Sequence, residues 1–224
     1  MVGLNSGFSI AIDPALFGRI AIGGFRYTLE APAGATRDPL REEWRAAAAA
    51  LKTMTDAGGD PLAAPLKEMR ALRPPFDPRR PLYPHAERLL HDALAGRADP
   101  PALAVDCLCE VISLASFCPA YALDETQARP PLTLRPPAPD ENLRVQGAPQ
   151  PLDDFALLAG GAGPLATPTL RGDTGRADAA TRRLLLVVFS PQAGERLRRA
   201  LALAADLAAR HLEARPMESF QAGI

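Results

Sequence analysis

The longest nearly uncharged stretch of the sequence is ALAVDCLCEVISLASFCPAYALD, residues 102–124, where only Asp106, Glu110 and Asp124 carry a formal charge. Apolar side chains recur in it at spacings of three and four residues: Leu103, Cys107, Leu108, Val111, Ile112 and Leu114. This spacing places them around most of a helix, and burying each large one contributes roughly 1.5–3 kcal/mol. Pro119 ends the helix and leaves residues 121–124 as an extended exit. The stretch therefore predicts a core helix with a pocket at its exit.

The composition is that of a globular protein without a strong charge bias. The chain has 224 residues, of which 47% are hydrophobic and 23% charged, and a net charge of -1. We expect a single domain over residues 1–224, with a core over 7–213 and a C-terminal tail over 214–224. The near-zero charge offers no overall attraction to nucleic acid, so a basic patch must be local. No signal peptide and no run of ~18–20 uncharged apolar residues is found, so we expect a cytoplasmic protein without membrane contact.

The cysteines and histidines do not match the spacing of a metal site. Cys107, Cys109 and Cys118 all lie on the buried stretch, and this odd number on one helix argues for free thiols in a reducing compartment. Cys107 and Cys109 point to different sides of a helix. His85 and His91 lack the i, i+4 spacing of paired ligands and are expected on a helix surface. The sequence therefore predicts no metal and no cofactor.

The rest of the chain mixes strands and helices without regular alternation. Strands are expected at residues 7–12, 25–31, 130–139, 141–147 and 182–190. Helices are expected at residues 13–20, 40–54, 62–72, 84–96 and 191–215. Gly23-Gly24 is interpreted as a break before a strand, and Gly160 to Gly163 as a plain turn rather than a phosphate cradle. The uninterrupted LLLVVF of the last strand predicts burial on both faces, and the element order favours an α+β domain with a mixed sheet.

One basic stretch stands out, in the proline-rich segment of residues 60–83. Its arginines are Arg70, Arg73, Arg79 and Arg80. A planar guanidinium suits phosphate recognition, so these residues are candidates for RNA binding. A solvated surface loop explains the same composition, and the sequence leaves both interpretations open.

Polar residues also bracket the apolar elements, although no standard catalytic motif is present. Glu110, Tyr121 and Asp124 surround the core helix. A second group precedes the last buried strand: Arg171, Asp173, Thr174, Arg176 and Thr181. Such a loop can clamp a phosphate or a carboxylate between guanidinium groups, or it can form a self-paired surface turn.

The order of these segments resembles the third-and-fourth-domain module of the phenylalanyl-tRNA synthetase β subunit. The segments that carry the resemblance span residues 8–213 in this order: FSIAIDPALFGRI, EEWRAA, PHAERLLHDALAG, VISLASFCPAYALD, LTLRPPAPDENL and RGDTGRADAATRRLLLVVF. The best local matches are SLASFCPAYALD and Thr181. The resemblance implies an α+β module with a β-sandwich-like core and flanking helices. In the synthetase, this module hydrolyses wrongly attached tyrosine from tRNA.

Carried over residue by residue, the resemblance places a pocket at the end of the core helix. Cys109 and Glu110 fall where the synthetase has a Thr-Asn pair, Tyr121 falls at a His, and Asp124 matches an Asp. We expect Glu110 and Tyr121 to be catalytic, the first orienting water and the second donating a hydrogen bond. The substrate-binding candidates are Cys109, Asp124, Arg171, Asp173, Arg176 and Thr181.

Three functions follow as hypotheses. The first is a tRNA-binding module that acts in trans as an aminoacyl-tRNA deacylase, for which a positioned water and oxyanion donors suffice. The second is a non-catalytic RNA-binding module that uses the two arginine-rich segments. The third is a small-molecule or protein-binding domain on the same scaffold, which the replacement of the editing residues favours.

Overall fold

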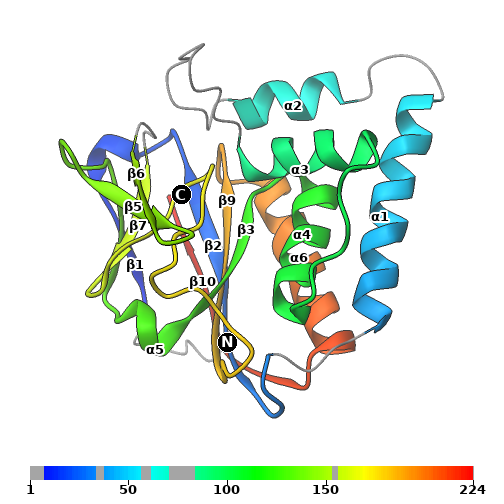
Figure 1. The fold of residues 1–224 in the computed structure, drawn as a ribbon. Coiled ribbons are helices and arrows are strands. Elements are labelled where there is room, and N and C mark those ends of the chain that lie inside the picture. Colours follow the sequence, from blue (N-terminus) through cyan, green and yellow to red (C-terminus); the bar gives the residue numbers. More distant parts are fainter. Residues whose placement is uncertain (1–7, 34–37, 57–61, 71–83, 153–155, 224) are drawn as a thin grey trace, which may run out of the picture.

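Figure 1 shows a computed structural model in which two β layers lie beside a layer of helices. The structure describes residues 8–33, 38–56, 62–70, 84–152 and 156–223. The central four-stranded sheet has the order β10 (Ala214–Ala222), β2 (Ala21–Leu29), β9 (Arg183–Ser190) and β3 (Ala120–Asp124), and all its neighbours are antiparallel. The α+β fold class with a mixed, sandwich-like core is confirmed.

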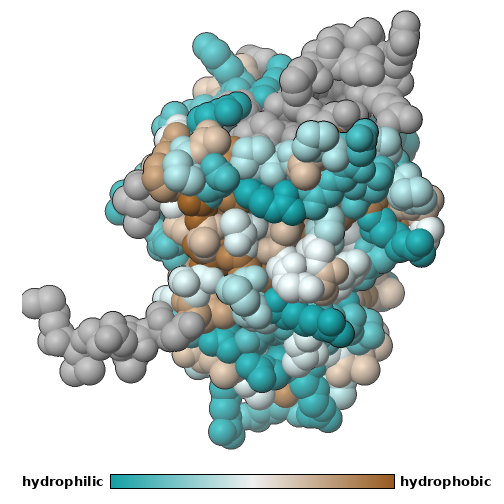
Figure 2. Space-filling model, turned by 90° about the vertical axis from the view of Figure 1, so that its left-hand side faces the viewer, coloured by the Kyte–Doolittle hydropathy of each residue, from teal (hydrophilic) through white to brown (hydrophobic). Residues whose placement is uncertain are grey.

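A second sheet packs against one face of the central sheet. Its order is β1 (Ile10–Ile12), β4 (Leu132–Arg135), β7 (Leu157–Gly160) and β8 (Gly163–Ala166), and only the β1–β4 pair is parallel. The turn between β7 and β8 is the plain turn expected at the glycine-rich segment. A separate hairpin is formed by β5 (Asn142–Val145) and β6 (Ala148–Pro151). Apolar surface gathers in the middle of this side of the molecule, between polar side chains (Figure 2).

The helices cover the other face of the central sheet (Figure 1). They are α1 (Asp38–Asp56), α2 (Ala63–Met69), α3 (His85–Leu94), α4 (Ala104–Ser116) and α6 (Glu195–His211). Two short elements complete the chain, the 3-10 helix η1 (Pro14–Leu16) and the helix α5 (Glu125–Ala128). Among the described residues, no helix combines the length and the apolar character needed to cross a membrane.

Strand β9 separates two hydrophobic cores. Leu184, Leu186 and Val188 pack among the helices, whereas Leu185, Val187 and Phe189 pack between the two sheets. Successive side chains of a strand point to opposite faces, so an uninterrupted apolar run fills both cores. The predicted burial of this strand on both faces is confirmed.

Gly23 and Gly24 lie inside β2, so their interpretation as a break before the strand was wrong. A Cβ atom on Gly24 would lie 1.9 Å from the backbone oxygen of Leu186 and 2.7 Å from Cζ of Phe220. The glycine is therefore required by the close approach of β9 and β10, a constraint set by tertiary structure rather than by a turn.

The core helix α4 is shorter than the stretch that predicted it. It ends at Ser116, and Phe117 adopts the left-handed conformation with φ 59°. The Ser113 hydroxyl donates to the Cys109 carbonyl oxygen at 2.8 Å and accepts from the Ala120 amide at 3.0 Å. These bonds turn the chain directly into β3, so the extended exit is a fully buried strand paired with β9.

The expected C-terminal tail is also different in the structure. Helix α6 ends at His211, and residues 214–222 form the edge strand β10, which pairs with β2 from Ala214 to Ala222 with one bulge between Pro216 and Glu218. Phe220 is buried against Phe8 with the ring centroids 5.3 Å apart, which anchors the strand to the core between the sheets. The segment is therefore part of the fold rather than an appendage.

Candidate functional site

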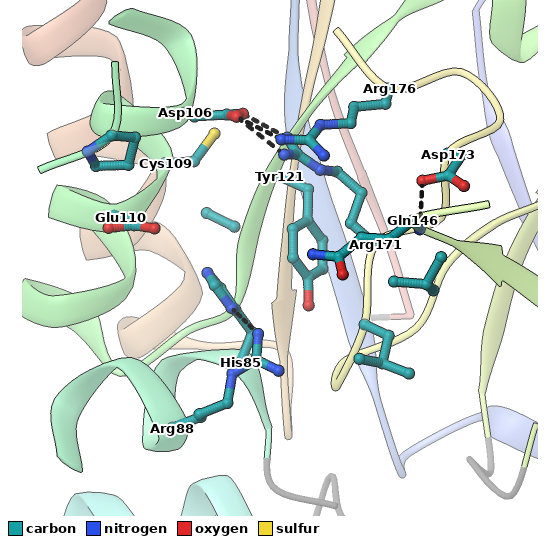
Figure 3. A pocket seen from close by; sticks show the side chains of 14 residues that line it. His85, Arg88, Asp106, Cys109, Glu110, Tyr121, Gln146, Arg171, Asp173 and Arg176 are labelled. Carbon is teal, nitrogen blue, oxygen red and sulfur yellow. Dashed lines mark hydrogen bonds and ion pairs between the residues drawn. The ribbon is translucent and has the colours of Figure 1, made fainter. Parts of the chain in front are cut away.

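A cavity of about 300 Å³ opens where α3, α4 and β3 meet the loop that precedes β9 and the β5–β6 hairpin. Figure 3 shows ten of its lining side chains converging from these elements. They are His85, Arg88, Asp106, Cys109, Glu110, Tyr121, Gln146, Arg171, Asp173 and Arg176. Six of these residues, Cys109, Glu110, Tyr121, Arg171, Asp173 and Arg176, are candidates from the sequence, and the fold brings them together in one cavity.

Arg171 joins the loop to helix α4 through an ion pair with Asp106. Its Nη2 lies 3.0 Å from Asp106 Oδ2, and its Nη1 also donates to the Ala122 carbonyl oxygen at 3.2 Å. Both side chains are largely buried, with 15% and 12% of their surface exposed. Arg176 approaches the same Asp106 oxygen at 3.4 Å but is 49% exposed. The two guanidinium groups thus differ, because Arg171 fixes one wall of the cavity whereas Arg176 stands at its mouth.

Glu110 is the cavity residue best suited to exchange a proton near neutral pH. Its Oε2 accepts a hydrogen bond of 2.8 Å from the indole nitrogen of Trp44 on α1. Burial raises the pKa of Glu110 to about 7, and nearby Asp106 adds to this rise, while the Trp44 bond opposes it. A carboxyl group with such a pKa in a cavity is a candidate general base.

His85 and Arg88 also line the cavity, and the prediction of His85 as a surface residue was wrong. Both lie on the first two turns of α3, and Arg88 Nη2 is 3.3 Å from His85 Nδ1. The His85 ring centroid is 5.2 Å from that of Tyr121. Burial, together with Arg88 and Arg171, lowers the pKa of His85 to about 3, so the ring is neutral near pH 7. No local pattern distinguishes this histidine, because its neighbours in the cavity come from distant segments.

Cys109 and Tyr121 form the buried floor of the cavity. Burial raises the pKa of the Cys109 thiol well above its ordinary value, so the sulfur is protonated and poorly nucleophilic. The Tyr121 hydroxyl donates to the Pro168 carbonyl oxygen at 3.4 Å. These groups give the floor apolar and weakly polar surface rather than charge.

Asp173 ties the loop to the hairpin. Its carboxylate accepts hydrogen bonds from the backbone amides of Gln146 at 2.9 Å and Gly147 at 2.7 Å. The carboxylate is therefore held by the turn between β5 and β6. This arrangement shapes the cavity rim.

Asp124 and Thr181 lie together, but they are not among the residues that line the cavity. Asp124 caps α5 by accepting from the Thr126 and Gln127 amides, and the Thr181 hydroxyl donates to its Oδ2 at 3.0 Å. Side chains at an N-cap satisfy amides that have no partner within the helix. The pair thus fixes the chain where β3 ends and β9 approaches.

The proposed RNA-binding arginines are placed only in part. Arg70 Nε lies 3.0 Å from Oε1 of the buried Glu87, with 48% of the arginine side chain exposed. Arg73, Arg79 and Arg80 lie outside the described residues. Within the ranges that the structure describes, no three His, Cys, Asp or Glu side chains gather in a way that suits a metal ion.

The fold is similar to that of a solved synthetase fragment. An N-terminal fragment of the phenylalanyl-tRNA synthetase β subunit from Pyrococcus horikoshii superposes with a TM-score of 0.53 at 12% sequence identity. The match covers 96% of this chain and 54% of the fragment, so the chain spans about half of that fragment's length. No family model and no curated protein matches the sequence. The resemblance to the β subunit expected from the sequence is therefore shown at the level of the fold.

Proposed function

We propose that the cavity binds the aminoacyl group of an aminoacyl-tRNA and that the protein hydrolyses its ester bond in trans. The observation that carries this proposal is a single cavity that holds a carboxyl group with a pKa of about 7 and, at its mouth, an exposed guanidinium. The fold it shares with the synthetase fragment supports the choice of substrate. The volume of about 300 Å³ suits an aminoacyl group, while the polynucleotide stays outside.

The reaction needs few groups. Glu110, in its ionised form, takes a proton from a water molecule as that water attacks the ester carbonyl carbon. The bond to the ribose oxygen then breaks, and this oxygen leaves as a hydroxyl after taking up the proton. The Tyr121 hydroxyl exchanges its 3.4 Å bond to the Pro168 carbonyl oxygen for a bond to the developing oxyanion, and Arg176 contacts the terminal phosphate. The neutral Cys109 takes no part as a nucleophile.

Replacing Glu110 with Gln is expected to slow hydrolysis about 100-fold, because an isosteric amide cannot accept the proton from water. The measurement is release of the amino acid from a panel of aminoacyl-tRNAs, under single-turnover conditions. Glu68→Gln is the matched control, since Glu68 pairs with Arg196 at 2.8 Å and does not line the cavity. Hydrolysis of no panel member by the folded protein, or equal rates for wild type and Glu110→Gln, contradicts the proposal.

A small-molecule-binding domain without catalysis is the second candidate. The observation that favours it is that the charges of Asp106 and Arg171 are paired with each other in a largely buried position. Such a wall presents a carboxylate and a guanidinium, which can recognise the ammonium and carboxylate groups of a free amino acid. A rise in the melting temperature of the protein with free amino acids, together with no hydrolysis of any aminoacyl-tRNA, supports this candidate over the deacylase.

Removing the guanidinium at the mouth tests the contact with tRNA. Arg176→Ala is expected to weaken tRNA binding about threefold to tenfold, because one phosphate contact is lost. For the same reason, the affinity of this variant is expected to fall less steeply as the salt concentration rises. Arg199→Ala is the control, since Arg199 is 78% exposed on α6 and pairs with Glu195. Binding measured by filter retention at several salt concentrations distinguishes the two variants. An equal loss in both, or none in Arg176→Ala, argues against the contact.

A further inference from the structure

Trp44 contacts the candidate base from outside the cavity. It lies on α1, is 3% exposed, and is not among the residues that line the cavity. Its indole Nε1 donates to Glu110 Oε2 at 2.8 Å. The indole nitrogen can only donate a hydrogen bond and an ionised carboxylate can only accept one, so the direction of this bond is fixed.

We propose that Trp44 is a positioning residue, which fixes the Glu110 carboxyl group so that its other oxygen, Oε1, faces the bound water. The inference rests on the proposed function in one respect, namely that Glu110 acts as the base. It adds a residue from a different helix to the site. The role requires the indole N–H and not merely a large apolar side chain.

The contacts of Glu110 support this assignment. Among the described residues, the bond from Trp44 is its one hydrogen bond, so Oε1 is left for a ligand or water in the cavity. The other charged groups that act on Glu110 are Asp106 on its own helix, Arg171 on the loop and Arg88 on α3. They act through space, whereas Trp44 fixes the position of one oxygen atom. A carboxyl group held in this way loses little freedom when it takes the proton.

The competing explanation is packing. Trp44 belongs to the hydrophobic core between the helices, with Leu40 and Leu51 of the same helix. A packing role is fulfilled by Phe, which keeps an aromatic ring but lacks the N–H group. Trp44→Phe therefore separates the two roles, and Leu51→Val serves as a control that alters the packing of α1 and keeps the bond.

The first measurement uses the wild-type protein, and a unique probe is available because Trp44 is the one tryptophan in the sequence. In an NMR titration, we expect the chemical shift of its indole N–H to change with pH. The midpoint of this change is expected to equal the midpoint for the chemical shift of the Glu110 side-chain carboxyl carbon. In Glu110→Gln this shift is expected to disappear. An indole resonance that does not titrate between pH 5 and 9 overturns the proposal, whether or not the protein hydrolyses any ester.

The second measurement uses the variants. In Trp44→Phe the midpoint for Glu110 is expected to rise by about one pH unit, because a hydrogen bond to the charged form is lost. The base works in its ionised form, so the rise of kcat/KM with pH moves upward by the same amount, and kcat falls while KM is retained. Leu51→Val is expected to change neither midpoint. An unchanged midpoint in Trp44→Phe, an equal change in Leu51→Val, or a raised KM with kcat retained overturns the proposal.

Discussion

Arg26→Met is expected to lower the free energy of unfolding by about 3–5 kcal/mol, because it leaves a buried carboxylate with little compensation. Arg26 donates through Nε to Glu125 Oε1 at 3.0 Å and through Nη1 to Glu218 Oε2 at 2.8 Å. The side chain of Glu125 is 5% exposed, and that of Arg26 is 15% exposed. Among the described residues, Glu125 Oε2 has no hydrogen bond of its own, so the Arg26 contact carries much of the compensation.

The same arginine connects three elements of the fold. It lies on β2 and binds Glu125 on α5 and Glu218 on β10, and its guanidinium carbon is 4.7 Å from the centre of the Phe8 ring. Met retains much of the apolar stem, so the loss reports on the charge rather than on packing. Guanidinium chloride denaturation, followed by circular dichroism, measures the change.

Arg183→Met is the matched control for this prediction. Arg183 also contacts Glu125 Oε1, at 3.1 Å, but its side chain is 47% exposed. Water compensates for much of the loss at such a position, and we expect a change of about 1 kcal/mol or less. Equal losses in the two variants contradict the assignment of the buried pair as the dominant contact.

Gly24→Ala is expected to cost about 4 kcal/mol or more, or to abolish folding, because the new Cβ atom has no room. The atom that it meets at 1.9 Å is a backbone oxygen, that of Leu186 on the neighbouring strand. Backbone in the centre of a sheet cannot move without breaking its pairing with both neighbours. Soluble yield and the denaturation midpoint measure this effect.

Gly23→Ala is the control, because it makes the same chemical change one residue earlier on β2. Its nearest contact is the terminal Cδ1 atom of the Leu201 side chain at 2.9 Å, and this atom can rotate away. The cost is therefore expected to be clearly smaller than at Gly24. A larger loss at Gly23 than at Gly24 contradicts the explanation.

The sequence predicted the elements whose burial can be recognised from the residue pattern of a single short segment. Strand β9 and helix α4 were found because an apolar run and a three-four spacing each reflect burial directly. Strand β10 was missed, because ARPMESFQA is mostly exposed at the sheet edge and alternates little. Gly24 was misread for a related reason, since its close neighbours are Leu186 and Phe220, far away along the chain.

The residues of the candidate site divide in the same way, into those recognisable within one segment and those that depend on contacts between distant segments. Glu110 and Tyr121 lie next to a recognisable core segment, and Arg171 and Arg176 lie just before a recognisable strand. His85, Arg88 and Trp44 were not identified, because they act at the site through contacts between separate helices that no spacing within one segment encodes. The sequence thus predicts residues on the elements that bear the site and misses those that reach it from other helices.

The alternation of side chains along β9 has a consequence for how the molecule unfolds. Leu185 and Leu186 are neighbours in the chain, yet they belong to different cores. Withdrawing the strand from the helices therefore also withdraws its side chains from between the sheets. We therefore expect the two cores to unfold together, and the cavity, whose floor includes Tyr121 of the adjacent strand β3, to be lost with them.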